Sequence, residues 1–181
     1  MTFNIRNILK TLSTKRPVFH SEADFQFALA WEIQAQFPEA KIRLEVPIRD
    51  ERKEYLDIRV EFEGSPILIE LKYKTEKSAI EHEGEYFSLQ RHGAYLCNRY
   101  DFFKDVSRVE RFIQKYQHSH GYCVMLSNEA HYWHQAEKDT FDKDFSLREG
   151  RTVSGALAWQ EKTGKGTMEN RERPIVLNNT Y

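Results

Sequence analysis

The chain has 181 residues, of which 40% are hydrophobic and 30% charged, enough for one compact domain with a real core. Its formal net charge of −1 excludes polyanion binding through overall positive charge, so such a partner would need a local basic surface or a metal ion. No apolar run approaches the length of a membrane span, and no secretory signal is visible. Cys97 and Cys123 follow no metal-ligand spacing and fit buried thiols, so we expect a cytoplasmic protein without membrane contact.

The first half of the chain predicts a helix followed by strands. Ser21 is a suitable N-cap, with Asp24 three residues later, and Pro38 ends the helix that it starts. Alternating polar and apolar residues then indicate strands, and Gly64 lies in the turn between two of them. The expected elements are an irregular segment over 1–19 with room for one short helical turn, a helix over 21–37, a strand over 41–47, and a hairpin with strands over 55–63 and 67–73.

The second half is harder to divide. The strongest signal is an apolar stripe with helical spacing, formed by Phe102, Val106, Val109, Ile113 and Tyr116. The expected elements are a loop over 74–87, a short helix over 88–97, a helix over 101–117, a strand over 122–127, and strands over 145–148, 152–159 and 175–177. This order predicts a single α/β domain over 1–181, with a central mixed sheet flanked by helices. The core covers about 21–127, and 128–181 form a β-rich C-terminal extension.

One strand carries charges that need an explanation. Residues 67–73 are almost wholly apolar, but Glu70 and Lys72 interrupt them two residues apart. A strand buried on both faces does not carry charge without a partner, because unpaired buried charge is costly. Asp57, on the preceding strand, is a suitable partner.

The hairpin register decides which side chains meet. A tip centred on Gly64–Ser65 places Asp57 opposite Lys72 and Arg59 opposite Glu70. Asp57 and Glu70 are then diagonal neighbours roughly 7–8 Å apart, a separation at which two carboxylates can converge on one cation. The position of Arg59 leaves two interpretations of these charges open. If it turns away, the hairpin is a metal site, and if it pairs with Glu70, the charges are a structural salt bridge.

These residues resemble a known motif. Asp57, then Glu70–Lys72 after twelve intervening residues, in a hairpin flanked by helices and strands in this order, resembles the PD-(D/E)XK nuclease superfamily. The resemblance covers about 21–127 and implies the restriction-endonuclease-like αβββαβ core. The proline that leads the family motif is absent, because Leu56 precedes Asp57.

The resemblance implies a metal-dependent nuclease that hydrolyses phosphodiester bonds. Asp57 and Glu70 would bind Mg²⁺ or Mn²⁺, with the Leu71 carbonyl as a third ligand, and Lys72 would assist attack by water. Glu22 matches a glutamate that recurs in the first helix of many members, so it joins the candidate catalytic residues. An acid in the first turn of a helix is also favoured by the helix dipole alone.

The expected partner is nucleic acid, with DNA favoured. The candidate contacts are Lys74, Lys77, Arg99, Lys104 and Arg108. Lys104 and Arg108 belong to a basic stripe, continued by Arg111 and Lys115, that lies about 200° around the helix from Phe102. The alternative is that this stripe is only the solvated face of the helix.

Two other function classes stay open. The fold could serve as a catalytically silent nucleic-acid or protein-binding module, or as a small-molecule-binding α/β protein with an accidental motif. Zinc is not expected, because neither His118-Ser119-His120 with Cys123 nor His131 with His134 completes a four-ligand set. The oligomeric state is open, with a homodimer as one alternative.

Overall fold

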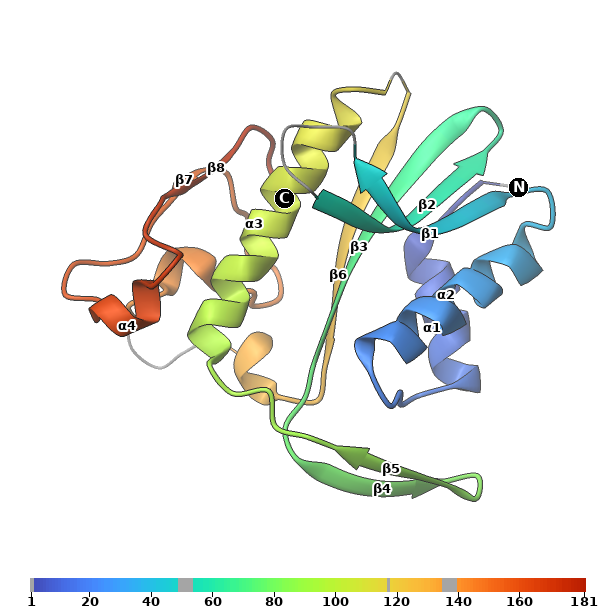
Figure 1. Ribbon diagram of the computed structural model, residues 1–181, viewed down its shortest axis with the longest axis horizontal. Coiled ribbons are helices and arrows are strands. Elements are labelled where there is room, and N and C mark those ends of the chain that lie inside the picture. The colour runs from blue at the N-terminus through green and yellow to red at the C-terminus, as the bar shows by residue number, and fades with distance from the viewer. Residues whose placement is uncertain (1, 49–53, 117, 135–139) are drawn as a thin grey trace.

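The computed structural model describes residues 2–48, 54–116, 118–134 and 140–181 (Figure 1). Its helices are α1 (Ile5–Lys15), α2 (Glu22–Gln36), α3 (Tyr95–Ile113) and α4 (Lys165–Met168), with 3₁₀ turns η1 (Ala130–Tyr132) and η2 (Lys143–Phe145). Its strands are β1 (Lys41–Ile48), β2 (Glu54–Phe62), β3 (Ser65–Lys74), β4 (Ser78–His82), β5 (Glu85–Leu89), β6 (His120–Ser127), β7 (Gly155–Leu157) and β8 (Ile175–Leu177). Among the described residues, no helix is both long and apolar enough to cross a membrane.

The main sheet is mixed, as the sequence predicts. Its order is β1-β2-β3-β6, with β1, β2 and β3 antiparallel and β6 parallel to β3. The parallel pair is joined by a crossover that contains α3, since parallel neighbours cannot be joined by a tight turn. Helices α1 and α2 cover one face of the sheet and α3 lies over the other (Figure 1). The α/β fold class is therefore confirmed.

Helix α2 begins where the sequence places it. Ser21 has an extended backbone, and its hydroxyl accepts a hydrogen bond from the Asp24 amide at 3.1 Å. The helix buries Phe25, Leu29 and Ile33 against the sheet. The irregular segment expected at the N-terminus instead contains α1, whose buried side chains join the same core.

The segment after β3 differs from the prediction. Instead of a loop and a short helix, residues 78–89 form the β4–β5 hairpin, which projects from the body of the protein (Figure 1), and α3 starts earlier, at Tyr95. Glu83 and Gly84 have φ of 50° and 79°, as a two-residue hairpin turn requires. Phe87 and Leu89 bury the inner side of β5. The alternation of polar and apolar residues in these two short strands was not recognised, because the segment carries many charges.

The turn between β2 and β3 corrects the predicted register. The positive φ values fall on Glu63 and Gly64, so the tip lies between these two residues and Phe62 pairs with Ser65. The pairing is shifted by two residues from the prediction. Because side chains alternate with a period of two, this shift alone leaves the facing of the paired residues unchanged.

The C-terminal extension is less rich in strand than predicted. Among its described residues, only β7 and β8 are strands, each of three residues, and they pair with each other. The predicted strand over 145–148 is absent from that region. The extension packs Phe145, Leu157 and Leu177 against Tyr100 and other residues of α3. Its loops are held by single side-chain contacts, such as the Trp159 indole N–H bound to the Arg171 carbonyl at 2.8 Å, which sequence periodicity does not reveal.

Gly121, at the start of β6, lies where α3 closely approaches the sheet. A Cβ at this position would lie 2.4 Å from Val109 Cγ1 and 3.1 Å from Ile113 Cγ2. Gly121→Ala is therefore expected to destabilise the fold by about 1–3 kcal/mol through overpacking. Thermal unfolding checks this against Gly164→Ala, whose added Cβ meets nothing within 4 Å. Equal melting temperatures for the two variants would contradict the close packing.

Candidate functional site

The conspicuous polar site lies where β2 separates from β3. The ladder between the two strands ends at the pair Ile58 and Ile69. Beyond it, the backbone N–H of Leu71 donates to Asp57 Oδ2 at 2.6 Å, and that of Tyr73 donates to Glu22 Oε2 at 2.7 Å. Two carboxylates thus take the place of the strand partner. Satisfying these amides positions both side chains beside β3.

Strand β2 twists at Asp57. Leu56 packs on the α3 side of the sheet, whereas Ile58 packs on the α1 and α2 side, although residues two apart on a regular strand share a face. On β1, Glu45 has φ 49° and interrupts the pairing with β2 at this level. The Gln26 amide donates to the Asp57 carbonyl at 2.7 Å and to Glu45 Oε1 at 2.8 Å, which holds the two strands in this conformation.

Arg59 does not compete for Glu70. It lies opposite Leu68, donates to Glu61 Oε1 at 2.6 Å, and places its guanidinium 5.1 Å from the ring centre of Tyr116. Of the two alternatives that the sequence left open, the salt bridge between Arg59 and Glu70 is therefore wrong.

Glu70 is the buried centre of the site, with 2% of its surface exposed. Its Oε2 accepts a hydrogen bond from Arg108 at 2.5 Å, but its Oε1 is buried without a hydrogen-bond partner among the described residues. Burial, followed by the negative charge of Asp57, raises the pKa of Glu70 to about 8. The positive charge of Arg108 acts in the opposite direction without cancelling them. An added cation near Oε1 would relieve both costs.

Lys72 lies beside this carboxylate. Its Nζ is 2.8 Å from Asp105 Oδ2 and 3.3 Å from the Leu71 carbonyl oxygen. Burial acts to lower the pKa of Lys72, but the carboxylates of Asp105, Glu22 and Glu70 outweigh it, so the pKa is raised. Lys72 therefore stays protonated at neutral pH, where it serves as a cation and hydrogen-bond donor rather than as a base.

Two residues of the site, Asp105 and Arg108, come from α3. Arg108 contacts Asp105 Oδ1 at 2.9 Å as well as Glu70, so the pair closes a network with Lys72. The sequence placed Arg108 on an outer stripe and assigned Asp105 no role. One signal in the sequence could have indicated this. Asp105 and Arg108 are spaced i, i+3, and Phe112, one turn further along the same side of the helix, is fully buried against the sheet. Residues on both sides of α3 are covered, so Asp105 and Arg108 lie between layers, while Lys104 on the same helix stays exposed.

The predicted nucleic-acid contacts divide into two groups. Lys74 lines a cleft of about 310 Å³ together with Glu22, so it lies near the site. Lys104 is exposed on α3, and Lys77 is exposed between β3 and β4. These positions are compatible with contact to a polymer.

Arg99 does not belong with them. Only 4% of its surface is exposed, and its guanidinium pairs with the fully buried Asp142 at 2.6 Å and donates to the His131 carbonyl. Because these partners already occupy its guanidinium inside the protein, Arg99 is a structural residue and not a contact for nucleic acid.

The residues of this site suit a hard divalent cation. Asp57 Oδ1 and Glu70 Oε1 accept no hydrogen bond from the part of the chain that is described, so each carboxylate has one oxygen to offer. The Leu71 carbonyl oxygen accepts a long contact from Lys72 Nζ at 3.3 Å. Carboxylate and carbonyl oxygens are the ligands that Mg²⁺ and Mn²⁺ prefer. The residues present therefore fit the predicted metal.

A second donor group lies beyond the ends of β3 and β6. Ligand atoms of Glu76, Glu129 and His131 all fall within 4.8 Å of one another, and within the described ranges no other set of three histidine, cysteine or carboxylate side chains is so close. Two of these side chains are exposed, and exposed acidic groups are common without a metal ion. The group is separate from Asp57 and Glu70.

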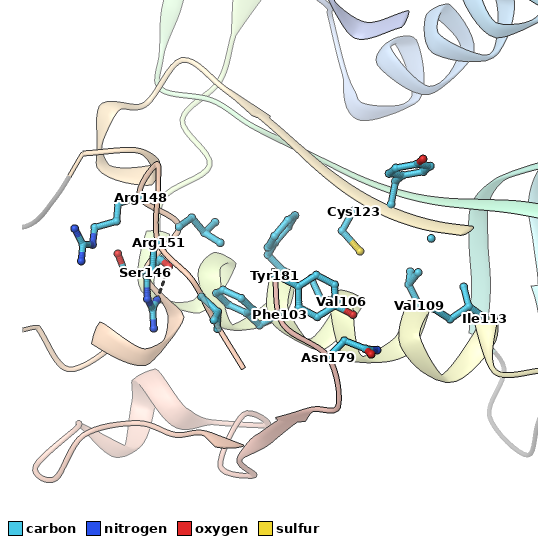
Figure 2. Close-up of a pocket in the computed structure, with 15 residues that line it drawn as sticks. Phe103, Val106, Val109, Ile113, Cys123, Ser146, Arg148, Arg151, Asn179 and Tyr181 are labelled. Carbon is cyan, nitrogen blue, oxygen red and sulfur yellow. Dashed lines mark hydrogen bonds between the residues drawn. The ribbon is translucent and has the colours of Figure 1, made fainter. Parts of the chain in front are cut away.

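An apolar cavity of about 530 Å³ lies between α3, β6 and the C-terminal residues (Figure 2). Phe103, Val106 and Val109 form its wall, and Tyr181 lies across it. Burial raises the pKa of the Cys123 thiol well above its usual range, so this side chain is an inert lining group. Because reactive groups do not converge in the cavity, the carboxylate site remains the candidate.

Comparison with known proteins adds no assignment to this geometry. No family model, no curated protein and no solved structure matches the chain. The functional conclusion therefore depends on the residues themselves.

Proposed function

We propose that the protein is a divalent-metal-dependent nuclease that hydrolyses phosphodiester bonds in nucleic acid, with DNA as the favoured substrate. The observation that carries this proposal is the buried, unpartnered oxygen of Glu70, next to Asp57 and a protonated Lys72. A carboxylate pair with one oxygen each to offer attracts a divalent cation, and the adjacent ammonium favours a negatively charged substrate.

The roles follow from the contacts. Asp57 and Glu70 would hold Mg²⁺ or Mn²⁺ with the Leu71 carbonyl, and the ion would supply charge neutralisation at the phosphate and a water of lowered pKa. Lys72 donates hydrogen bonds and positive charge to the oxygens that become more negative during attack. Glu22, fixed by the Tyr73 amide, positions β3 and adds negative charge beside Lys72.

The topology supports the resemblance to the restriction-endonuclease-like core. Within residues 22–127, a helix, three antiparallel strands, a helix and a strand parallel to β3 follow one another, as the αβββαβ order requires. The β4–β5 hairpin and α1 are additions to that order. The candidate residues lie on the second and third strands and at the start of α2.

The proposal is tested by incubating the purified protein with plasmid DNA, single-stranded DNA and RNA, each with Mg²⁺, Mn²⁺ or EDTA. We expect cleavage of at least one polymer that requires the metal and stops with EDTA. Cleavage that persists in EDTA, or that separates from the protein during a final size-exclusion step, would contradict it.

One observation favours the catalytically silent module as the second candidate. Arg108 and Lys72 already pair with Glu70 and Asp105, which balances much of the charge without a metal ion. A silent module would bind nucleic acid or protein without turnover and would show the same affinity in Mg²⁺ and in EDTA. A metal-dependent nuclease would not.

The raised pKa of Glu70 predicts the pH dependence of metal binding. A proton on Glu70 competes with the cation, and its pKa in the folded protein is about 8. Mn²⁺ affinity is therefore expected to rise by up to about tenfold per pH unit as the pH approaches 8 from below, and to level off above it. Isothermal titration calorimetry at several pH values measures this. A constant affinity from roughly two pH units below the Glu70 pKa to one unit above it would show that Glu70 is not a ligand.

A further inference from the structure

A polar cleft of about 640 Å³ lies beside the candidate site, between α3 and residues 170–176. Its charged lining is formed by Lys104, Arg108, Arg111, Arg173, Glu54 and Glu172. Arg111 is paired with Glu54 at 2.6 Å. Lys104 and Arg173 are exposed and form no ion pair with any residue in the described parts of the chain. Basic groups therefore dominate the accessible part of the cleft, which suits an anionic group.

Arg108 belongs both to this cleft and to the carboxylate site. Its guanidinium donates to Glu70 Oε2 at 2.5 Å and lies 2.9 Å from Asp105 Oδ1, yet 20% of its side chain is exposed and it lines the cleft. One side chain thus joins a carboxylate that suits a cation to a space that suits an anion.

The contact between Arg108 and Glu70 leaves hydrogen-bonding capacity unused on both partners. Arg108 Nε and Glu70 Oε1 are each buried without a hydrogen-bond partner among the described residues. A buried polar atom without a partner costs free energy, so the pair is not the best arrangement for either side chain. A phosphate can accept two parallel hydrogen bonds from a guanidinium, and a divalent cation can take both oxygens of a carboxylate.

We propose that the cleft binds a backbone phosphate of the nucleic acid and that Arg108 exchanges Glu70 for this phosphate, so that the polymer and the divalent cation bind cooperatively. The inference rests on the proposed function and adds its regulation. Without polymer, Arg108 occupies Glu70 Oε2 and weakens metal binding. With polymer, the carboxylate is released beside Asp57. Because coupling between two binding sites is reciprocal, the cation strengthens polymer binding by the same factor.

The test replaces Arg108 by methionine, which keeps much of the side-chain length and removes the charge. Mn²⁺ binding is measured without nucleic acid, by electron paramagnetic resonance of the free ion, at a pH above the Glu70 pKa of about 8. Arg108→Met is expected to bind Mn²⁺ at least about tenfold more tightly than the wild type. Binding of a short fluorescent DNA duplex in EDTA is expected to weaken, with a salt dependence reduced by about one charge. Arg43→Met, at an exposed position on β1, is the matched control and should change neither affinity.

In Arg108→Met, Mn²⁺ affinity is expected to rise and DNA affinity to fall. A purely structural role of Arg108 would instead weaken both affinities. Lys104→Ala is expected to weaken DNA binding alone, because Lys104 is exposed and lines only the cleft. A folded Arg108→Met protein with unchanged or weaker Mn²⁺ affinity overturns the inference. If the wild type also cleaves DNA and Asp57→Asn loses Mn²⁺, the proposed nuclease function survives that failure, and if the wild type binds no Mn²⁺ through Asp57, both fail.

Discussion

Replacing Lys72 by alanine is expected to reduce metal-dependent cleavage by roughly 10²–10³-fold, the usual cost of removing one positioned charge from a site that stabilises developing negative charge. The reason is that Lys72 is the protonated group nearest to Glu70 on β3, held there by Asp105 at 2.8 Å. Single-turnover cleavage of the polymer found to be a substrate, with Mg²⁺ in excess, measures the loss. Lys165→Ala, an exposed lysine in α4, is the matched control.

Glu70→Gln and Asp57→Asn are expected to abolish cleavage and to lower Mn²⁺ affinity together, because each substitution removes a charged oxygen ligand. Glu39→Gln, at an exposed position, controls for a general loss of charge. Cleavage at the wild-type rate by a folded Lys72→Ala or Glu70→Gln protein would remove the site from the mechanism.

The second large effect concerns stability. Glu110, on α3, has only 1% of its surface exposed, and its carboxylate binds the C-terminal residues. It accepts hydrogen bonds from the amides of Asn178 and Asn179 at 3.0 and 2.8 Å and from the Tyr181 hydroxyl at 2.7 Å. Glu110→Ala leaves these donors without their acceptor and is expected to cost roughly 2–4 kcal/mol. That corresponds to a fall in melting temperature of about 5–10 °C.

The pH dependence of this effect has a definite sign. Burial acts to raise the pKa of Glu110, but the hydrogen bonds from Asn178, Tyr181 and Asn179 outweigh it, and the pKa is lowered below 4.5. The folded state therefore gains stability from Glu110 above the ordinary carboxyl pKa and loses it as the pH falls through the lowered value. The difference between wild type and Glu110→Ala, measured by thermal unfolding with Glu149→Ala as an exposed control, should shrink in acid. If Glu110→Ala has the same melting temperature as the wild type at neutral pH, the carboxylate does not hold the C-terminal residues.

Local features of the sequence were predictable because they depend on short spacings. The Ser21 cap lies three residues before Asp24, and Glu70 and Lys72 interrupt an apolar strand, so both could be identified without tertiary information. Asp57 also lies beside β3 as expected, although it accepts a hydrogen bond from the Leu71 amide, which the register alone does not predict. The register itself depended on whether Glu63–Gly64 or the next pair forms the turn. A glutamate with positive φ is not a residue that such turns usually select.

The contribution of α3 could not be predicted in the same way. An amphipathic pattern identifies one buried face, but it does not tell whether a second layer covers the opposite side. Here the C-terminal extension packs on Tyr100 and Phe103 while Phe112 faces the sheet, so Asp105 and Arg108 lie between layers rather than in solvent. Their role depends on contacts between segments far apart in the sequence, which the helical spacing of residues 101–117 alone does not contain.

The proposed function depends most on whether Asp57 and Glu70 hold a divalent cation. Crystals soaked in Mn²⁺ and measured for anomalous scattering locate the ion directly. We predict an anomalous peak within about 2.0–2.6 Å of carboxylate oxygens of both residues. A peak only at the Glu76, Glu129 and His131 group would contradict the proposed metal site.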